Sequence, residues 1–265
     1  MTITLSPEEY ATAYRLITAT AKHPENITEV VKTRLLDQLG NKPTLLDVGA
    51  GNCAVARRLA SFFSRMVLLE PNPNQVAGFD HPRATVLSES LQGFESTEQF
   101  DLVLLSHVLY HVPRAEWPGF VERLMSFVRP GGYALIVMAA AHGQEYELCQ
   151  SFSDTWAGDT TELYAELQVT NLEYEVLATT SGFSTTTLAE METVCRFLVL
   201  EECYTAAQLD RLGSVRAQQL DADIRSHAKR YRKPDGTYRL NQDEDFVIIR
   251  RPGASSPAEP GRKRR

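Results

Sequence analysis

The stretch Leu45-Leu46-Asp47-Val48-Gly49-Ala50-Gly51-Asn52-Cys53 decides the fold class of this 265-residue chain. Its apolar beginning is typical of a buried parallel strand. The two glycines allow the backbone to turn tightly, and they allow a ligand to approach without meeting a Cβ atom. Apolar side chains at helical spacing follow in residues 53–64. A strand, a glycine turn and a helix in this order predict the first unit of an open α/β sheet.

The same alternation continues along the chain. Four more apolar runs have the length of buried strands, at residues 66–69, 84–87, 102–105 and 133–138, and a second helical pattern fills residues 117–128. Together with residues 44–48 this makes five strands joined by crossover segments. The pattern predicts an α/β, Rossmann-like doubly wound sheet.

Helices are predicted on both sides of this region. Ser6, Pro7 and Glu9 form a helix-start signal for residues 7–21. An apolar repeat over residues 27–39 predicts a second helix, which Gly40 ends. In the last third the pattern predicts a helix at 172–181, a strand at 185–191, a helix at 205–232 and a closing strand at 246–249.

These elements fit a single domain over residues 1–251. It would comprise N-terminal helices at 1–40, a lid segment at 141–167 and a helical insertion at 201–244. Residues 252–265 are dominated by Pro, Gly, Ser, Lys and Arg, which predicts a disordered tail.

The composition narrows the function classes. The net charge of −7 argues against a nucleic-acid partner, and no run approaches the roughly 18 apolar residues that span a membrane. The first residues lack the features of a secretory signal. Four scattered cysteines without a CxxC pair predict reduced thiols in a cytoplasmic protein. We therefore expect a small-molecule partner, and the sequence leaves open a monomer or a dimer.

The glycine turn alone fits two classes of cofactor. Its G-x-G-x-x-A spacing also suits a dinucleotide, and Glu70, at the end of the second strand, suits the ribose hydroxyls of either class. Asp47 lies two residues before the first glycine, where its carboxylate can accept a hydrogen bond from an ammonium group or from a water bound to it. A nicotinamide cofactor has no amino-acid end, so Asp47 favours a cofactor that has one.

Four motifs in register resemble the class I S-adenosylmethionine-dependent methyltransferases. They are D-V-G-A-G-N, L-E-P-N-P, F-D-L-V-L-L-S-H and R-P-G-G-Y, and they lie between residues 44 and 140. The resemblance implies that Gly49 and Gly51 pass beneath the methionine part of S-adenosyl-L-methionine and that Glu70 binds its ribose. The segment Glu89-Ser90-Leu91 would border the adenine, and the product would be S-adenosyl-L-homocysteine.

A second resemblance covers most of the chain and is to the histamine N-methyltransferase-like small-molecule methyltransferases. It rests on residues 10–23, on Glu70-Pro71-x-x-x-Gln75, on the L-Y-H-V run ending at Val112 and on residues 240–249. It implies substrate contacts from His107 and Gln242. The predicted cofactor-binding set is Tyr14, His23, Asp47, Gly49, Gly51, Asn52, Glu70, Pro71, Gln75, Glu89, Ser90, Leu91 and Ser106.

The run from Ser106 to Val112 follows the fourth predicted strand, at the edge where open α/β sheets carry their active sites. His107 and His111 are four residues apart, so on a helical turn both would face the same way. They lack the glutamate of an H-E-x-x-H zinc motif, and we expect no metal. His107, His111 and Tyr110 are the predicted catalytic residues, with a packed core histidine as the alternative for His111.

The segment at 141–167 mixes aromatic and acidic side chains, including Tyr146 and Trp156. This mixture suits a cationic or protonatable nitrogen in the substrate; the alternative is core aromatics beside a solvated acidic face. Lys22 stands where the resemblance expects an acidic residue, which favours a substrate that carries its own carboxylate. The predicted substrate-binding set is Lys22, His107, Tyr146, Trp156 and Gln242.

The sequence thus predicts a methyltransferase that acts on a small molecule, by N-methylation of an amine, imidazole or amino acid-like compound. Methyl transfer is an in-line displacement that needs close approach and alignment more than a covalent nucleophile. O- or C-methylation of a biosynthetic intermediate, a non-catalytic protein that binds S-adenosylmethionine, and an NAD-dependent dehydrogenase are the alternatives.

Overall fold

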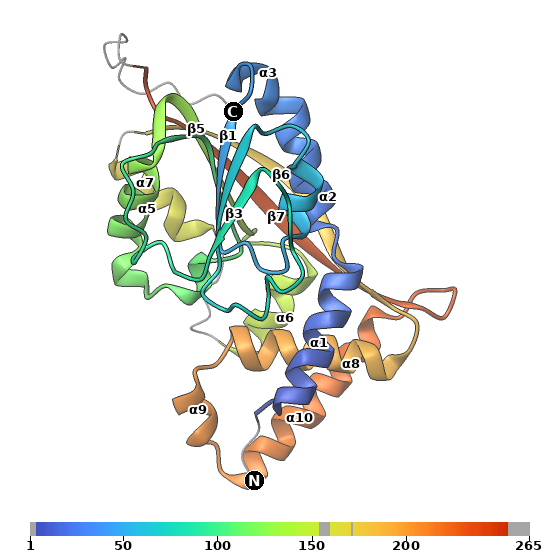
Figure 1. Ribbon diagram of the computed structural model, residues 1–265. Helices are drawn as coiled ribbons and strands as arrows, with labels where there is room; N and C mark the ends of the chain where they lie inside the picture. The colour runs from blue at the N-terminus through green and yellow to red at the C-terminus, as the bar shows by residue number, and fades with distance from the viewer. Residues whose placement is uncertain (1–3, 154–159, 171, 254–265) are drawn as a thin grey trace. The chain divides into compact units, whose positions relative to one another are not determined.

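A computed structural model describes residues 4–153, 160–170 and 172–253 of the chain (Figure 1). Its seven-stranded sheet has the order β3-β2-β1-β4-β5-β7-β6. The strand pairs β2–β3, β1–β2, β1–β4 and β4–β5 are parallel. Their bounds are β1 Thr44–Val48, β2 Arg65–Leu69, β3 Ala84–Leu87, β4 Phe100–Ser106, β5 Val128–Ala139, β6 Glu173–Thr185 and β7 Tyr238–Arg250. The predicted α/β Rossmann-like sheet is confirmed.

Helices separate the strands. Ahead of β1 they are α1 Pro7–Thr20, α2 His23–Val30, the π-helical η1 Val31–Leu35 and α3 Leu36–Leu39. Between β1 and β5 they are α4 Ala54–Leu59, the short 3₁₀ turns η2 Leu109–His111 and η3 Arg114–Glu116, and α5 Trp117–Ser126. After β5 they are α6 Gln144–Phe152, α7 Thr161–Val169, α8 Leu188–Phe197, the π-helical η4 Leu198–Glu202, α9 Ala206–Asp210, α10 Ser214–Ala228 and η5 Lys229–Tyr231.

The chain divides into two compact units. Unit 1 comprises residues 1–22, 139–159 and 180–244, and unit 2 comprises residues 23–138, 160–179 and 245–265. The strands β5, β6 and β7 each contribute residues to both units. A single methyltransferase domain over residues 1–251 therefore stays a prediction.

Unit 2 has the three layers of a doubly wound fold. One face of its strands packs against α5 and α7 through a cluster that includes Phe120, Leu124 and Leu163. The other face packs against α2, η1, α3 and α4, with Ile27 and Leu59 in that cluster (Figure 1). Because both faces of the sheet are covered, its strands are apolar along their length, which is why the sequence located them so well.

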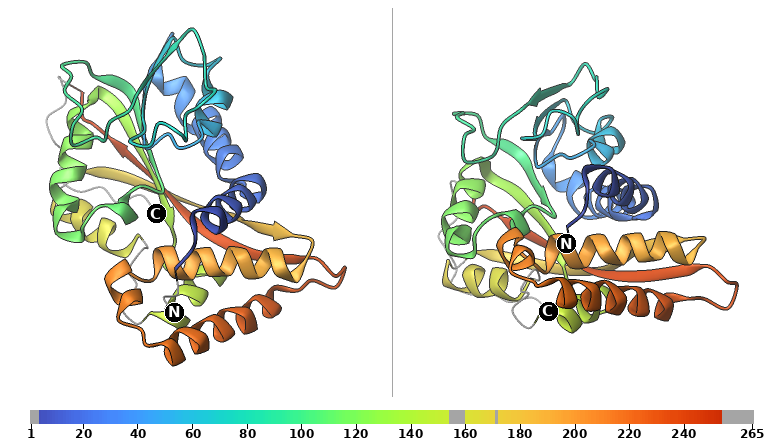
Figure 2. Two further views of the ribbon diagram at one scale, coloured as in Figure 1. Left: turned by 60° about the horizontal axis from the view of Figure 1, so that its bottom comes forward. Right: turned by 90° about the horizontal axis from the view of Figure 1, so that it is seen from below.

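Unit 1 is built on helices with well-formed N-termini. Ser6 and Thr187 each make a capping box with the glutamate three residues on, at the starts of α1 and α8. Figure 2 shows α8 and α10 running side by side. Arg196 on α8 pairs with Asp221 on α10 and with Glu9 on α1. The helix at the start of the chain confirms the prediction for residues 7–21.

The prediction of a helix at 172–181 is wrong, because this segment begins β6. Its side chains alternate between less and more exposed positions, as they do on the edge strand of a sheet. The strand predicted at 185–191 is also wrong beyond Thr185, since α8 begins at Leu188. Here the capping box of Thr187 and Glu190 was the overlooked signal.

Three boundaries also differ from the prediction. The helix predicted at 205–232 is interrupted at residues 211–213, and the helical insertion ends at η5 because residues 238–244 belong to β7. The lid segment at 141–167 has two parts, α6 in unit 1 and α7 in unit 2. Each part buries apolar side chains, at Leu148 and Leu163 among others, so its helices are packed elements. All but the first two residues of the predicted tail at 252–265 lie outside the described residues.

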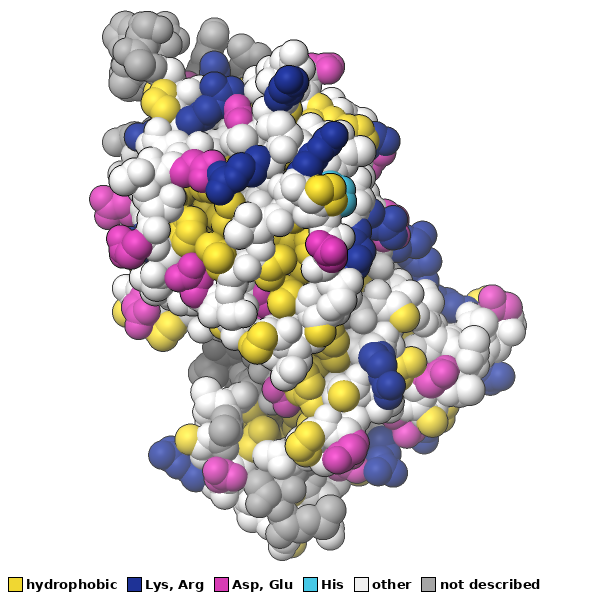
Figure 3. All heavy atoms as spheres, in the orientation of Figure 1, with side chains coloured by type: hydrophobic (Ala, Val, Ile, Leu, Met, Phe, Trp, Pro, Cys, Tyr) yellow, Lys and Arg dark blue, Asp and Glu magenta, His cyan; other side chains and the backbone are white. Residues whose placement is uncertain are grey.

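No helix in the described part of the chain has the length and apolarity to cross a membrane. Figure 3 shows Lys and Arg side chains interspersed with Asp and Glu side chains on the face in view.

Two glycines provide a matched test of the backbone at β6. Gly182 has φ +141°, and a Cβ atom there would lie 2.4 Å from the carbonyl oxygen of Leu240. Gly119 lies in α5, and no heavy atom is within 4 Å of its Cβ position. We expect Gly182→Ala to lower the free energy of unfolding by about 2 kcal/mol or more, and Gly119→Ala to raise it by about 0.5–1 kcal/mol. Urea denaturation measures both; equal effects of the two substitutions would contradict the packing described for Gly182.

Candidate functional site

The glycine turn after β1 is the first element of the site. Gly49 and Gly51 have φ values of +75° and +52°, and Cys53 has φ +58°. Gly49 and Ala50 both donate their backbone N–H to the carbonyl oxygen of Leu69, at 2.8 and 3.0 Å. Three left-handed residues within five give the chain a sharp reversal at the end of β1.

The turn leaves no room for a side chain at Gly49. A Cβ atom at this position would come within 2.3 Å of Val108 Cγ2, a side chain on the segment after β4. The sequence pattern marked Gly49 but gave no signal for Val108. The glycine turn and the segment after β4 therefore lie close together at the ends of β1 and β4. These two strands are neighbours in the sheet, and the direction of chain winding changes between them.

Glu70 binds the turn through its carboxylate. Its Oε2 accepts a hydrogen bond from Gly51 N–H at 2.9 Å, and its Oε1 accepts one from Asn72 N–H at 2.9 Å. The residue is half-buried and follows β2. The side chain predicted to hold ribose therefore also fixes the position of the glycine turn.

Asp47 is the second acidic group, and it is buried with 3% of its surface exposed. Burial and, to a smaller extent, the nearby charge of Glu70 raise the pKa of its carboxyl from 3.8 to about 7. No hydrogen-bond partner for this carboxyl exists among the residues that the structure describes. A buried acid in this state is suited to a positively charged group.

His107 lies at the end of β4, directly after the half-buried Ser106. Its backbone is left-handed, with φ +55°, and its N–H donates to the carbonyl oxygen of Val137 at 3.0 Å. Its Nδ1 is hydrogen-bonded to the hydroxyl of Tyr110 at 3.2 Å. The ring of His23 lies against it, with 4.6 Å between the ring centroids. The structure thus brings together three predicted site residues, His23, His107 and Tyr110.

The predicted helical pair of His107 and His111 is wrong. The 3₁₀ turn η2 covers only residues 109–111 and begins after His107. The left-handed backbone of His107 removes the regular spacing that would place both rings on one face. His111 is exposed, so it is not a packed core histidine either.

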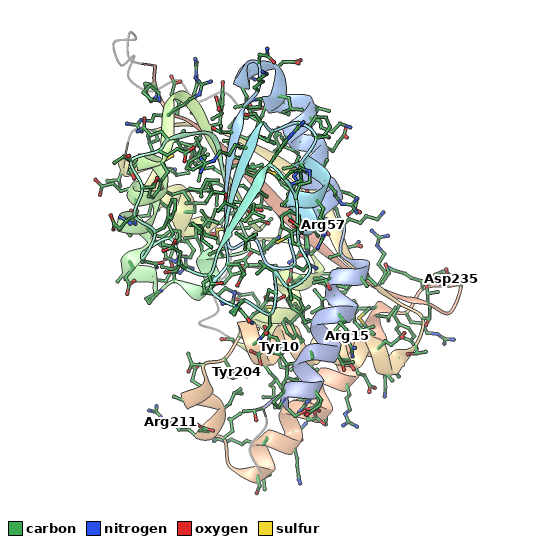
Figure 4. All side chains as sticks on the ribbon, in the orientation of Figure 1. Tyr10, Arg15, Arg57, Tyr204, Arg211 and Asp235 are labelled. Carbon is green, nitrogen blue, oxygen red and sulfur yellow. The ribbon has the colours of Figure 1, made fainter. Side chains whose placement is uncertain are left out.

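The segments after β2 and β3 hold the remaining predicted cofactor residues of unit 2. Gln75 is half-buried and Pro71 is exposed. Arg57 of α4, labelled in Figure 4, places its guanidinium 4.8 Å from the centre of the Phe79 ring and so covers the segment after β2. Asn52 accepts a hydrogen bond from Ala54 N–H at the start of α4.

Arg123 on α5 fixes the segment after β3. Its Nε donates to the carbonyl oxygen of Leu91 at 2.8 Å, and its Nη2 donates to that of Phe94 at 2.5 Å. Glu89 and Ser90 are half-buried beside the buried Leu91. Sequence reasoning missed Arg123, since an arginine among the apolar residues of an amphipathic helix is ordinary.

The other predicted residues do not belong to unit 2. Tyr14, Lys22, Tyr146 and Gln242 lie in unit 1, and Trp156 lies outside the described residues. Lys22 is exposed, whereas Gln242 is buried. Their predicted roles toward cofactor and substrate stay predictions.

Asp47 gives a testable pH dependence. Because its pKa is raised in the folded protein, the stability contributed by its protonated form is complete below about pH 4 and is lost as the pH rises through about 7. Asp47→Asn should therefore be more stable than the unliganded wild type at pH 8. The difference in the free energy of unfolding should be about 1.4 kcal/mol for each unit by which folding raises the pKa of Asp47. Near pH 4 the two proteins should be equally stable. Urea denaturation across this range measures the difference. The exposed Asp37→Asn is the control, and a pH-independent gap for Asp47→Asn would contradict the assignment.

Comparisons with known proteins agree with this geometry. A family model of methyltransferase domains matches residues 21–192. The ubiquinone biosynthesis O-methyltransferase of Methylobacterium sp. (strain 4-46) is 33% identical over 111 residues, which cover 36% of this chain and 42% of that protein. The match thus spans less than half the length of this relative.

Solved structures show the same fold. Phosphoethanolamine N-methyltransferase 2 of Haemonchus contortus, in complex with S-adenosyl-L-methionine, aligns with a TM-score of 0.56 at 16% identity over 92% of this chain and 57% of that one. A cyclopropane synthase of Mycobacterium tuberculosis aligns with a TM-score of 0.52 at 17% identity over 92% and 94% of the two chains. The family match decides against the dinucleotide interpretation of the glycine turn. This chain belongs to the methyltransferase domain family, whose methyl donor is S-adenosylmethionine, and its fold is the class I fold that the sequence predicted.

Proposed function

We propose that this protein transfers a methyl group from S-adenosylmethionine to a nitrogen atom of a small molecule, an amine, imidazole or amino acid-like compound. The observation that supports binding of this cofactor is the carboxyl of Asp47, which is buried next to the glycine turn and has a raised pKa. The amino-acid end of the cofactor carries the ammonium group that such a carboxyl accepts.

Glu70 can serve the ribose without releasing the turn. Each carboxylate oxygen has two lone-pair positions, and the hydrogen bonds from Gly51 and Asn72 occupy one on each. The remaining positions can accept from ribose hydroxyls. Glu70→Gln would replace one oxygen by an NH₂ group, so it would remove an acceptor from the ribose or from the turn.

The reaction is a displacement at the sulfonium methyl group. The lone pair of the acceptor nitrogen forms the new N–C bond while the S–C bond breaks and its electrons return to sulfur, which leaves S-adenosylhomocysteine. The protein has to align the two reactants and exclude competing water. When Nδ1 of His107 donates to Tyr110, Nε2 of the same ring is the acceptor and can take a proton from the methylated nitrogen.

The contact between His23 and His107 supports the finer resemblance to the histamine N-methyltransferase-like enzymes. That resemblance assigns His23 to the cofactor and His107 to the substrate, and the two rings lie 4.6 Å apart in unit 2. The role of Lys22 toward a substrate carboxylate is the weaker part of this proposal, since the Lys22 side chain is exposed.

O-methylation is the second candidate, and the ubiquinone biosynthesis O-methyltransferase relative favours it. A hydroxyl acceptor must lose its proton as the bond to carbon forms, so it would need His107 as a base. Replacement of His107 by Asn should then abolish O-methylation over the whole pH range, whereas N-methylation of a neutral amine should retain part of its rate at high pH.

Isothermal titration calorimetry tests the cofactor site. We expect the wild type to bind S-adenosylhomocysteine and not NAD. Because Asp47 must ionise to meet the ammonium group, binding near pH 6 should release a proton, detected as heat that depends on the buffer. Asp47→Asn should bind at least about tenfold more weakly, a loss of about 1.4 kcal/mol, and should lose the proton release. Exposed Asp37→Asn is the control, and proton release unchanged in Asp47→Asn would contradict this role.

A panel of radiolabelled methyl-transfer reactions tests the acceptor class. Amines, imidazoles, amino acids and phenols are incubated with the enzyme and labelled S-adenosylmethionine. Transfer to nitrogen compounds supports the first proposal, and transfer to phenols alone supports the second. Cofactor binding without transfer to any acceptor would favour the non-catalytic alternative.

A further inference from the structure

A pocket of about 430 Å³ extends along α10, and the described residues that line it all belong to unit 1. We call it the α10 pocket. Its volume lies within the range of sites that bind small molecules. Among the described residues, none of those predicted to bind the cofactor or the substrate lines it. A ligand in this pocket is therefore a property in addition to the proposed methyl transfer.

One face of α10 supplies most of the lining. Arg216, Leu220, Asp223 and His227 recur at intervals of three or four residues, so their side chains lie on one side of the helix. Arg230 continues this spacing in η5, directly after the helix. The described lining residues thus include two arginines and one carboxylate. The pocket carries positive charge, although the net charge of the whole chain is −7.

The pocket has an aromatic section at the end of α6. The rings of Phe152 and His227 meet edge to face, with 4.9 Å between their centres. The hydroxyl of Tyr204, labelled in Figure 4, donates to the carbonyl oxygen of Phe152 at 2.6 Å. Phe152 is thus held by two neighbours. Together with the buried Leu220 it provides a surface on which a flat apolar ring can pack.

His227 orients Arg230 without neutralising it. Nδ1 of His227 lies 3.2 Å from the carbonyl oxygen of Asp223, and since a carbonyl oxygen only accepts, this nitrogen carries the proton. Nε2 is then an acceptor, and Nη1 of Arg230 donates to it at 3.1 Å. A neutral imidazole therefore fixes the guanidinium group through one of its nitrogens and leaves its positive charge uncompensated.

The two arginines of the pocket differ from their neighbour Arg225. Arg225 lies on the same helix and pairs with Asp221 at 2.8 Å. Among the described residues, neither Arg216 nor Arg230 has an acidic partner. Arg216 precedes Arg230 by about 20 Å along the helix, at about 1.5 Å per residue. It adds positive potential at the other end of the pocket, whereas Arg230 is the oriented group.

A carboxylate suits the oriented guanidinium better than a phosphate does. Two parallel N–H···O bonds match the two oxygens of a carboxylate to a single guanidinium group. A phosphate monoester carries a further negative charge at neutral pH. This second charge would face the exposed carboxylate of Asp223, which lines the same pocket.

We propose that the α10 pocket binds an aromatic carboxylate that is not the methyl acceptor. Arg230 holds the carboxylate through two parallel hydrogen bonds, and the aromatic ring packs on Phe152 and Leu220. The site requires a ring and a negative charge in one molecule. This requirement separates its ligands from simple anions and from neutral aromatic compounds.

Isothermal titration calorimetry at low salt with 2-naphthoate as the probe tests the pocket. Arg230→Gln removes the oriented guanidinium, and Arg225→Gln, the matched control, removes the same charge from a side chain that is already paired. We expect the wild type and Arg225→Gln to bind 2-naphthoate, and Arg230→Gln to bind it at least about tenfold more weakly. To the wild type, 2-naphthylmethanol and acetate should each bind at least about tenfold more weakly than 2-naphthoate, because each lacks one of the two features.

Two further substitutions test the sign of the charge effect and the orientation of Arg230. Asp223→Asn removes a negative charge from the pocket and should strengthen the binding of 2-naphthoate about twofold. His227→Leu removes the acceptor that orients Arg230 and should weaken binding at least about threefold. Circular dichroism and urea denaturation establish that each variant is folded.

Three results would overturn the site. They are no binding of 2-naphthoate, equal binding of 2-naphthoate by the wild type and a folded Arg230→Gln, and equal binding of 2-naphthoate and 2-naphthylmethanol by the wild type. Tighter binding of 2-naphthyl phosphate than of 2-naphthoate, lost in Arg230→Gln, would replace the carboxylate by a phosphate.

The two proposals fail in different ways. Asp47→Asn should bind 2-naphthoate as the wild type does, although it loses affinity for the cofactor. Binding of 2-naphthoate that depends on Arg230, without methyl transfer to any acceptor, would leave the pocket standing and contradict the proposed function. Methyl transfer to amines without binding of 2-naphthoate would do the reverse. Transfer of labelled methyl to 2-naphthoate itself would make it an acceptor and overturn the inference.

Discussion

The hydrogen bond from Gly51 N–H to the Glu70 carboxylate joins the end of β1 to the end of β2, and the geometry of the proposed cofactor site depends on it. Gly49 and Ala50 add two bonds to the carbonyl oxygen of Leu69 from the same turn. These contacts hold a backbone that would otherwise be unfavourable for any residue except glycine. With the turn fixed, Val108 can pack closely against Gly49, where a Cβ atom would have no room.

Both units bury an acid whose pKa is raised by burial. Asp47 lies near Glu70 in unit 2, and Glu145 lies near Glu202 and Glu244 in unit 1. In each case burial and a neighbouring carboxylate raise a pKa together. Such groups lower the stability of the empty protein, and a cation that binds there recovers it. In unit 2 this arrangement supports the proposal that Asp47 meets the ammonium end of the cofactor.

The sequence located the strands of unit 2 because they are covered on both faces and read as continuous apolar runs. It also located Asp47 and Glu70, since their positions follow from the strand ends. The prediction failed for β6, because the alternation of apolar and polar residues in this edge strand is weak and resembles the pattern of a polar helix. It also failed for His111, because we assumed a regular helical turn between His107 and His111. The contacts of Val108 and Arg123 could not be predicted, because they join segments far apart in the chain.

The left-handed backbone of His107 has a consequence for how this chain can change. A residue other than glycine or asparagine at φ +55° is held at a cost of about 1 kcal/mol. A glycine at this position would relieve the strain, so a selection for thermal stability alone would replace the histidine. With the proposed role of His107 as a base, stability and chemistry are opposed at position 107, as in enzymes whose active-site residues are suboptimal for folding. A library screened for heat resistance should drift toward glycine there, whereas one screened for methyl transfer should keep the imidazole.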